Sequence, residues 1–480
     1  MARDYAAAIH LLNSLQSNAA VLDAIRKTGN LINTQSLPEF RTFVQRIGYT
    51  AKDFDQLSII HVSGTKGKGS TSAFVTRFCD RLVSPTEVRE RIRINGSPIS
   101  RETFARHFFS VWDKLENTKP AIIDLDHPDK PFYFRYLTLM SFEVFLEEKV
   151  DVVILEVGVG GEFDSTNVIE KPVVCGITSL GFDHVAILGN TIEKIAWHKS
   201  GIIKQGVPVI TAPQLPAAME TIHDRAKELK ASKVVEVSDV QMADLESYKL
   251  GLHGAHQRVN AALARQICEQ WIASRESAGS VFKNDPEYIR RGLELTQWPG
   301  RCQRIDSPDF PDIEWFIDGA HTPESLQVCV DWFKESVLSA TDASLPIYLV
   351  FNCTHGRDGL RLLPPLVDMF KTSKQLRSIV FCTNDPFSPE STSATASASD
   401  LTNNMVDLDP EHTSQHALAK AWATLAQDTP QSQVPTHVVD SVESAARLIA
   451  NDGSSKKRVL VTGSLHLIGS LMTLLHSEIV

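Results

Sequence analysis

The sequence predicts an α/β protein with two domains, each built on a mainly parallel sheet. Two observations lead to this prediction. The chain has 480 residues, 42% of them hydrophobic, which is more than one ordinary core accommodates. In both halves, short apolar runs of strand length alternate with longer amphipathic segments of helix length, the pattern of a sheet covered by helices.

The first landmark is a predicted strand that runs into a glycine-rich loop. Residues 57–62 form an apolar run, Gly64, Gly67 and Gly69 follow, and an Ala/Ser-rich helix is expected over 71–83. Glycines allow backbone N–H groups to approach an anion closely, and the start of a helix adds positive potential. The stretch therefore predicts a phosphate-binding P-loop, with a Gly- and Lys-rich surface turn as the alternative.

The charged groups of this loop fit the same interpretation. Lys68 would place a full positive charge against a phosphate. The spacing departs from the general P-loop, because Val62 stands in place of the first glycine. Gly69 occupies the usual Ser/Thr position, and Ser70 follows one place later.

Two further strands end in polar residues. Glu156 interrupts the apolar run that starts at 152, and glycines follow at 158, 160 and 161. A carboxylate at the end of a buried strand is costly unless it is paired or binds a cation, so we expect a metal ligand rather than a structural ion pair. The stretch 173–191 repeats the scheme, with a predicted strand followed by Asp183-His184 at its C-terminal end. Ligands collect at the carboxyl ends of parallel strands, which favours a site role for His184 over a structural one.

The remaining elements of the first half are assigned from periodicity and turn residues. A half-exposed strand is expected over 88–94, where Arg and apolar residues alternate before the Asn95-Gly96 turn. Helices are expected over 1–30, with a candidate loop at 13–18, and over 36–50, 101–118, 135–149, 191–204 and 213–232. Residues 251–268 are expected to begin as a glycine-punctuated loop that runs into a helix, and strands are expected over 207–212 and 234–240.

The second half predicts a Rossmann-like parallel sheet with helices between its strands. A Pro-Gly pair in 298–305 marks the boundary, giving domains 1–297 and 303–480 with a linker at 298–302. Residues 388–414 are rich in Ser, Thr, Ala and Asp and predict a flexible surface insertion. The expected strands are 313–317, 346–352, 378–383 and 458–462, two of which precede polar clusters at 318–321 and 355–358.

Composition narrows the function classes. The formal net charge is −10 without a basic block, which argues against nucleic acid as a partner. No apolar run reaches membrane-spanning length, and the first 20 residues have no signal-peptide pattern, so we expect a cytoplasmic protein. Seven cysteines without a CxxC pair indicate reduced thiols.

Read together, nine ordered motifs resemble the folylpolyglutamate synthases, a branch of the Mur-ligase-like family of ATP-dependent amide ligases. The resemblance spans nearly the whole chain and implies a P-loop domain like the Mur-ligase central domain, followed by a Rossmann-like ligase domain. The motifs are SGTKGKGST (63–71), VRERIRING (88–96), LEVGVGG (155–161), SLGFDHVAILGNTIEKIAWHKSGIIK (179–204), GAHQRVNAALA (254–264), WPGRCQRI (298–305), FIDGAHTPES (316–325), FNCTHGRDG (351–359) and VTGSLHLIGS (461–470).

The resemblance also implies a reaction and its participants. ATP would convert the γ-carboxylate of a folate, such as tetrahydrofolate or its polyglutamates, to an acyl phosphate. The amine of L-glutamate would then displace phosphate. Mg²⁺ is implied as cofactor and a monovalent cation as a further one, in a protein that works as a monomer.

Site residues carry over by position in the matching motifs. The resemblance assigns catalysis to Lys68, Lys199 and His321, with Lys199 aligned to a lysine that is carbamylated in several family members. It assigns Mg²⁺ to Glu156, His184 and Ser84. The ATP-binding residues that it implies are Gly64, Thr65, Lys66, Gly67, Lys68, Gly69 and Ser70, together with Arg301 and Asp318.

One departure from the family pattern affects this assignment. Family members have a turn, a strand and a Ser-Pro-His segment after the P-loop helix, whereas here the helix leads directly to Ser84-Pro85 and no His follows. Either Ser84 stands in for the family's serine ligand, or that ligand is lost. Three alternatives remain open: a dihydrofolate synthase or bifunctional ligase, a non-catalytic folate- or nucleotide-binding relative, and a generic P-loop ATPase or kinase.

Overall fold

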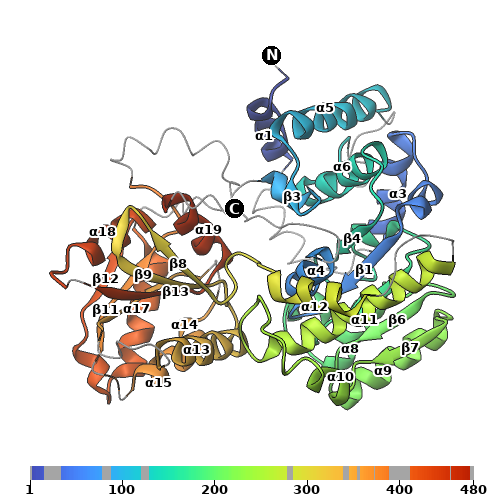
Figure 1. Cartoon of the computed structure of the whole chain (residues 1–480). Coiled ribbons are helices and arrows are strands. Elements are labelled where there is room, and N and C mark those ends of the chain that lie inside the picture. The colour runs from blue at the N-terminus through green and yellow to red at the C-terminus, as the bar shows by residue number, and fades with distance from the viewer. Residues whose placement is uncertain are drawn as a thin grey trace. The chain divides into compact units, whose positions relative to one another are not determined.

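The computed structural model divides the chain into two compact units (Figure 1). The first ends at Gln297 and the second begins at Trp298, and two short stretches, Val88–Glu90 and Leu252–Gly254, cluster with the second. Among the described residues, no helix combines the length and the apolar character needed to cross a bilayer. The structure describes residues 3–15, 34–77, 88–119, 129–277, 285–338, 345–353, 357–371, 373, 375–388, 411–454 and 456–475.

The first unit is built on a five-stranded, all-parallel sheet with the order β4-β1-β5-β6-β7. Strand β1 is buried along its whole length and lies between β4 and β5, so the chain segments that leave all three strands start side by side. The bounds are β1 Ile59–Ser63, β4 Val153–Glu156, β5 Val174–Ile177, β6 Pro208–Thr211 and β7 Lys233–Glu236.

Helices cover both faces of this sheet. On one face Gly176 of β5 leaves room for Ile267 of α11, whose side chain lies 2.6 Å from where a Cβ would be. On the other face Cys175 and Ile177 pack with Ile222 of α9. Successive β5 side chains thus point to opposite faces of the sheet, and each face is covered by helices. Helices α4 and α11 lie on the first face, and α8 and α9 pack together near the second, so the unit has three layers.

Most predicted helices of the first unit end within a few residues of their predicted limits, but α11 continues to Ser277, past the predicted end at 268. Helices α5 and α6 pack against each other (Figure 1) and α1 packs on both. The bounds are α1 Tyr5–Ser14, α3 Ser36–Arg46, α4 Lys68–Arg77, α5 Arg101–Asn117, α6 Tyr133–Glu147, α7 Val185–Leu188, α8 Ile192–Ser200, α9 Pro216–Glu228, α10 Asp239–Ala243, α11 His256–Ser277 and α12 Pro286–Leu295; the 3₁₀ turns are η1 Ala51–Leu57, η2 Val88–Arg91 and η3 Ser165–Val168.

The second unit contains a six-stranded sheet with the order β12-β11-β10-β13-β9-β8. All neighbours are parallel except β8, which pairs with β9 as an antiparallel edge strand. The bounds are β8 Gln303–Ser307, β9 Phe310–Asp318, β10 Ile347–Phe351, β11 Leu376–Cys382, β12 Thr436–Val439, β13 Lys457–Thr462, α13 Pro323–Leu338, α14 Gly359–Leu362, α15 Pro364–Phe370, α17 Thr413–Ala426, η5 Pro430–Gln433, α18 Val442–Ala450 and α19 Leu465–Leu474.

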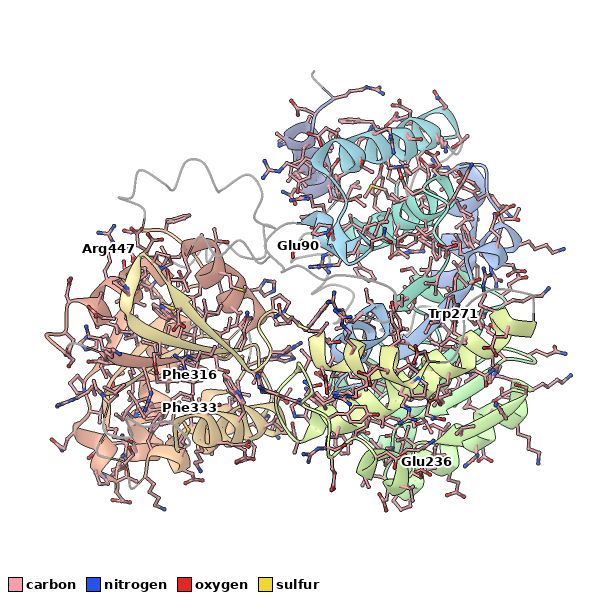
Figure 2. The ribbon with its side chains drawn as sticks, in the orientation of Figure 1. Glu90, Glu236, Trp271, Phe316, Phe333 and Arg447 are labelled. Atoms are coloured by element: carbon pink, nitrogen blue, oxygen red, sulfur yellow. The ribbon has the colours of Figure 1, made fainter. Side chains whose placement is uncertain are left out.

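Successive side chains along these strands point to opposite faces of the sheet, and they build two separate apolar cores. Phe316 of β9 packs with α13, where its ring centroid lies 5.1 Å from that of Phe333 (Figure 2). Its neighbours Trp315 and Ile317 point to the opposite face and pack with α18 and α19. A strand buried on both faces reads as a continuous apolar run, which is why the sequence identified these strands.

The predicted fold class is confirmed: both units are α/β and both sheets are mainly parallel. The strand expected over 88–94 is wrong, since 88–91 form a 3₁₀ turn and only Arg93–Ile94 pair, with Ser97–Pro98 across the Asn95-Gly96 turn. The P-loop helix begins at Lys68 rather than 71. Strands β8 and β12 were not predicted. Ser84, residues 16–30 of the first predicted helix, and most of the predicted insertion at 388–414 lie outside the described residues.

Candidate active site

The loop between β1 and α4 has the backbone geometry that its glycines predict. Gly64 has φ +142° and Gly67 has φ +89°, conformations that side chains rarely adopt. Neighbouring side chains also leave no room for a Cβ at either position. A Cβ on Gly64 would lie 1.9 Å from Thr178 Oγ1, and one on Gly67 would lie 2.2 Å from Asn260 Oδ1. Any larger residue at either position would displace the loop.

Two amides of the loop donate to the strand beside it. The N–H groups of Thr65 and Lys66 donate to the carbonyl of Ser179, at 3.1 and 3.0 Å, and the Thr65 hydroxyl donates to Gly181 O at 3.1 Å. These bonds fix the loop against the segment that follows β5. The N–H groups that helix geometry leaves for an anion are those of the first turn of α4, which starts at Lys68.

Two lysines approach the loop. Lys68 Nζ donates to Gly64 O at 3.0 Å, folded back across the loop it belongs to. Lys199, at the end of α8, donates to Gly64 O at 2.8 Å and is only 3% exposed. Burial, reinforced by the positive charge of Lys68, lowers the pKa of Lys199 to about 7, because both effects disfavour a second ammonium ion.

Helix α11 supports the loop from the first face of the sheet. Gln257 Nε2 donates to the Ser70 hydroxyl at 3.2 Å, and Asn260 Nδ2 donates to Gln257 Oε1 at 2.9 Å. Both amide side chains are buried. They therefore orient the one hydroxyl that stands next to the usual Ser/Thr position of a P-loop.

Glu156 and His184 flank the loop, as their places after adjacent strands require. Glu156 is opposite Val62 at the end of β4, and His184 belongs to the segment that leaves β5. The premise that Glu156 is a buried charge is wrong, because its side chain is exposed and keeps its hydration. An exposed carboxylate beside a phosphate loop still suits Mg²⁺, which prefers oxygen ligands and retains waters.

The segment that carries His184 is tied to the loop by charge. Lys66 Nζ lies 3.6 Å from Asp183 Oδ2, and Asp183 Oδ1 accepts the N–H of His184 at 2.9 Å. His184 itself has φ +50°, which is uncommon outside glycine and turn residues. The structure thus brings Lys66 and His184 to one edge of the sheet with Lys68, Lys199 and Glu156.

Asp164 organises the loop after β4. Its Oδ2 accepts the N–H groups of Gly158 and Val159, both at 3.1 Å. Its Oδ1 accepts the N–H and the hydroxyl of Thr166, at 2.9 and 2.6 Å. Thr166 in turn contacts His61 Nε2 of β1 at 3.0 Å, so one buried carboxylate joins the central strand to the glycine loop.

A cavity of about 390 Å³ lies behind this glycine loop. The rings of Phe134 and Phe163 and the side chains of Val159 and Leu188 give it a largely apolar lining, and the segment 158–161 forms one wall. Phe134 stands so close to this wall that a Cβ on Gly158 would lie 2.8 Å from its ring. The complete lining is Ser36, Phe134, Arg135, Gly158, Val159, Gly160, Gly161, Phe163, Asp164, Ser165, Ile187, Leu188 and His198.

The predicted site residues of the second unit cluster at the end of β9. Asp318 accepts the N–H groups of Cys302 and Ala320, both at 2.8 Å, which holds the chain at 300–302 against β9. Arg301 Nη1 lies 3.4 Å from where a Cβ on Gly319 would be. His321 Nδ1 is 2.9 Å from Gly319 O. The three predicted residues of this unit therefore occupy one small region of it.

Sequence reasoning missed the cavity and two supports of the loop. Ser179 supports the loop through its backbone carbonyl, and a contact made by the backbone leaves no signal in the residue type. Gln257 lies in the motif 254–264, but its bond to Ser70 depends on tertiary packing. Phe134 carried no sequence signal, because its 40% exposure on α6 is visible only in the structure.

No family model matches the chain. Individual relatives do. The folylpolyglutamate synthase of Neurospora crassa is 38% identical over 498 residues, covering 99% of this chain and 92% of the relative. The folylpolyglutamate synthase of Saccharomyces cerevisiae is 39% identical over 491 residues, covering 98% and 86%. The chain belongs to the folylpolyglutamate synthase family. Identity at this level over nearly the whole length extends the family assignment to both units.

Solved folylpolyglutamate synthase structures share the fold. The apo form of the L. casei enzyme has a TM-score of 0.70 at 22% identity, covering 99% of this chain and 100% of that one. The Mycobacterium tuberculosis enzyme complexed with ADP has the same TM-score, identity and coverage. A complex described as FPGS-AMPPCP-folate has a TM-score of 0.65 at 23% identity, covering 98% and 100%.

Proposed function

We propose that this chain is an ATP-dependent ligase that joins L-glutamate to the γ-carboxylate of folates through an acyl phosphate. The observation that carries the proposal is the P-loop of a chain in the folylpolyglutamate synthase family. Neighbouring side chains leave no room for a Cβ on Gly64 or Gly67 of this loop, and two lysines donate to its backbone. A carboxylate is a poor electrophile, and ATP is the co-substrate that converts it into a reactive mixed anhydride.

The positive charges of the site answer the main obstacle to this reaction. Bringing a carboxylate to a triphosphate sets anion against anion, so fixed cations must offset the repulsion. Lys68 exchanges its bond to Gly64 O for the β- and γ-phosphates, and the first-turn amides of α4 hold the same oxygens. Glu156 and His184 are the described residues that would hold Mg²⁺, which when bound neutralises phosphate charge. Ser84 remains a predicted third ligand.

The cavity behind the glycine loop suits the ring end of a folate. Phe134 and Phe163 offer faces on which a planar heteroaromatic ring stacks, and the apolar lining favours an uncharged group. A site for the ring there leaves the glutamate end of the folate, with its γ-carboxylate, free to extend toward another region. Residues Gly158–Gly161 would then separate the ring from the phosphate loop.

Lys199 is proposed as a carbamate in the working enzyme. Carbamate formation joins the neutral amine to CO₂ and releases one proton. A pKa of about 7 gives Lys199 a large neutral fraction at physiological pH, whereas an ordinary lysine is almost fully charged. Carbamylation replaces an ammonium that repels Lys68 with an anion that attracts it. The ¹³C NMR spectrum of protein equilibrated with ¹³CO₂ should contain one carbamate signal that Lys199→Met removes, and its persistence in that variant would contradict the assignment.

Three accompanying proposals concern the setting of the enzyme. The chain works as a monomer, a monovalent cation supports it, and it acts in the cytoplasm. The six described cysteines are free thiols and all are buried, which supports a reducing compartment. Sedimentation of the purified protein and activity with and without K⁺ test the first two, and imaging of the tagged full chain tests the third.

The decisive experiment is a ligation assay. Purified protein is incubated with ATP, Mg²⁺, tetrahydrofolate and labelled glutamate, with dihydropteroate replacing tetrahydrofolate in a parallel arm. We expect labelled polyglutamate product in the first arm, loss of it in Lys68→Ala, and no loss in Lys233→Ala, an exposed lysine on the edge strand β7. Nucleotide binding without product would favour a non-catalytic relative, and product from dihydropteroate would favour a bifunctional ligase.

A further inference from the structure

A cluster of ionisable side chains lies between α5 and α6 and takes no part in the site described above. His107 comes from α5, and Glu143 and Glu147 come from successive turns of α6. One ligand atom from each lies within 4.8 Å of the other two. His107 is 0% exposed and Glu143 is 0% exposed, so most of the cluster is sequestered from water.

Two atoms of this cluster are buried without a hydrogen-bond partner. They are His107 Nδ1 and Glu143 Oε1. Leaving such atoms unsatisfied costs free energy, more so for a charged group, so native structures rarely tolerate them. The two atoms lie 3.8 Å apart, beyond hydrogen-bond distance, and both face the same small space as Glu147 Oε2, which is 3.7 Å from Nδ1.

These separations suit two ligands of one metal ion. Ligand bonds of about 2.0–2.1 Å in a tetrahedral arrangement place neighbouring ligand atoms about 3.3 Å apart. The two distances from Nδ1 exceed this value by about half an ångström, and the exposed Glu147 side chain can move to close the cluster on an ion. Glu147 lies at the protein surface, with its side chain 47% exposed, which provides an entry path and a place for water as a fourth ligand.

Charged groups surround the cluster. His107 Nε2 accepts an N–H of Arg106 at 3.1 Å and lies 3.6 Å from Glu148 Oε1, beyond hydrogen-bond distance. Arg106 also donates to that carboxylate at 2.6 Å, and a ligating histidine commonly donates its other N–H to a carboxylate. Lys114 Nζ binds the other oxygen of Glu143 at 2.5 Å, leaving Oε1 for the ion.

We propose that His107 Nδ1, Glu143 Oε1 and Glu147 Oε2 form a zinc site that joins α5 to α6. Imidazole and carboxylate together suit Zn²⁺ better than Mg²⁺ or Ca²⁺, which prefer oxygen alone. Binding releases the proton from Nδ1 when His107 enters as an imidazolium. When His107 enters neutral, the proton moves from Nδ1 to Nε2, which gives up the N–H of Arg106 and donates to Glu148 instead. The site is structural, and it is separate from the predicted Mg²⁺ ligands Glu156 and His184.

The test measures Zn²⁺ bound to the full chain at buffered free concentrations, in the absence of ATP. Glu147→Gln keeps the size of an exposed side chain and is expected to fold. The matched control is Glu102→Gln, which removes an exposed charge from the same α5. We expect one equivalent of Zn²⁺ in the parent chain and in Glu102→Gln, with affinity at least tenfold lower in Glu147→Gln.

Two further readouts locate the ion. Co²⁺ should give visible d–d absorption of a tetrahedral site in the parent chain, and His107→Gln should abolish it. Saturating Zn²⁺ should raise the unfolding temperature of the parent chain and not that of Glu147→Gln. Equal Zn²⁺ affinity in the parent chain and Glu147→Gln, or no bound equivalent in the parent chain, would overturn the proposal in favour of a buried ion-pair network.

Discussion

Lys68 and Lys199 donate to the same atom, the carbonyl oxygen of Gly64, at 3.0 and 2.8 Å. Two ammonium groups on one acceptor repel each other, so the arrangement is stable only while one of them is neutral or an anion lies nearby. The burial of Lys199 identifies it as the group that gives up its charge. Lys68, at the start of α4, is the lysine that can turn toward a phosphate.

This difference predicts separate effects for the two lysines. Lys68→Met should weaken ATP binding about 10- to 100-fold, because a charge-assisted hydrogen bond contributes about 1.5–3 kcal/mol. Lys199→Met should leave ATP affinity within a few fold while abolishing ligation. Calorimetric titration with ATP in the absence of folate measures the first quantity. A Lys199→Met chain that loses ATP affinity as strongly as Lys68→Met would contradict this division of roles.

Gly67 is one of the two constrained glycines of the loop. Gly67→Ala combines a φ of +89° with a Cβ 2.2 Å from Asn260 Oδ1, and we expect it to destabilise the fold by about 1–3 kcal/mol and to abolish ATP binding. Adding Asn260→Ala removes the clash and leaves the backbone strain. The double variant should therefore recover part of the lost stability in urea unfolding. Complete recovery, or none, would show that only one of the two causes operates.

The cavity predicts a substitution that affects the folate and leaves the nucleotide unaffected. Gly158→Ala places a methyl group 2.8 Å from the Phe134 ring, and the ring must move into the cavity to make room. We expect the KM for tetrahydrofolate to rise at least tenfold with the KM for ATP unchanged. Gly453→Ala is the control, since its Cβ would meet no atom within 4 Å. An unchanged folate KM would place the ring elsewhere.

His61 makes the stability of the first unit sensitive to acid. Burial lowers the pKa of His61 to about 3, so between about pH 6.5 and 3 the unfolded chain binds a proton at this residue that the folded chain does not. Stability therefore falls as the pH is lowered through this range, by about 1.4 kcal/mol per pH unit for one proton. His61→Gln should make the fall shallower by about that amount in denaturant titrations at pH 6, 5 and 4. His223→Gln, at an exposed position, should keep the parent slope.

Much of the fold could be predicted because its strands are short apolar runs between glycines. The P-loop and the ends of β4 and β5 were recognisable for the same reason. The strand expected over 88–94 was wrong because alternating Arg and apolar residues also suit a turn with one buried side. β8 was missed because Gln303–Ser307 is an edge strand, whose polar residues face water. The exposure of Glu156 depends on how the chain folds after β4. The residue types near Glu156 do not reveal that path.

Asp164 holds the loop after β4 in place, and the separation of the cavity from the phosphate loop affects how substrate specificity can change. None of the cavity-lining residues that the structure describes belongs to the phosphate loop 63–70. Selection for a bulkier or differently substituted acceptor can therefore act on Phe134, Val159 or Ile187 while the nucleotide machinery stays intact. An inhibitor bound in this recess would therefore meet a surface that tolerates resistance mutations.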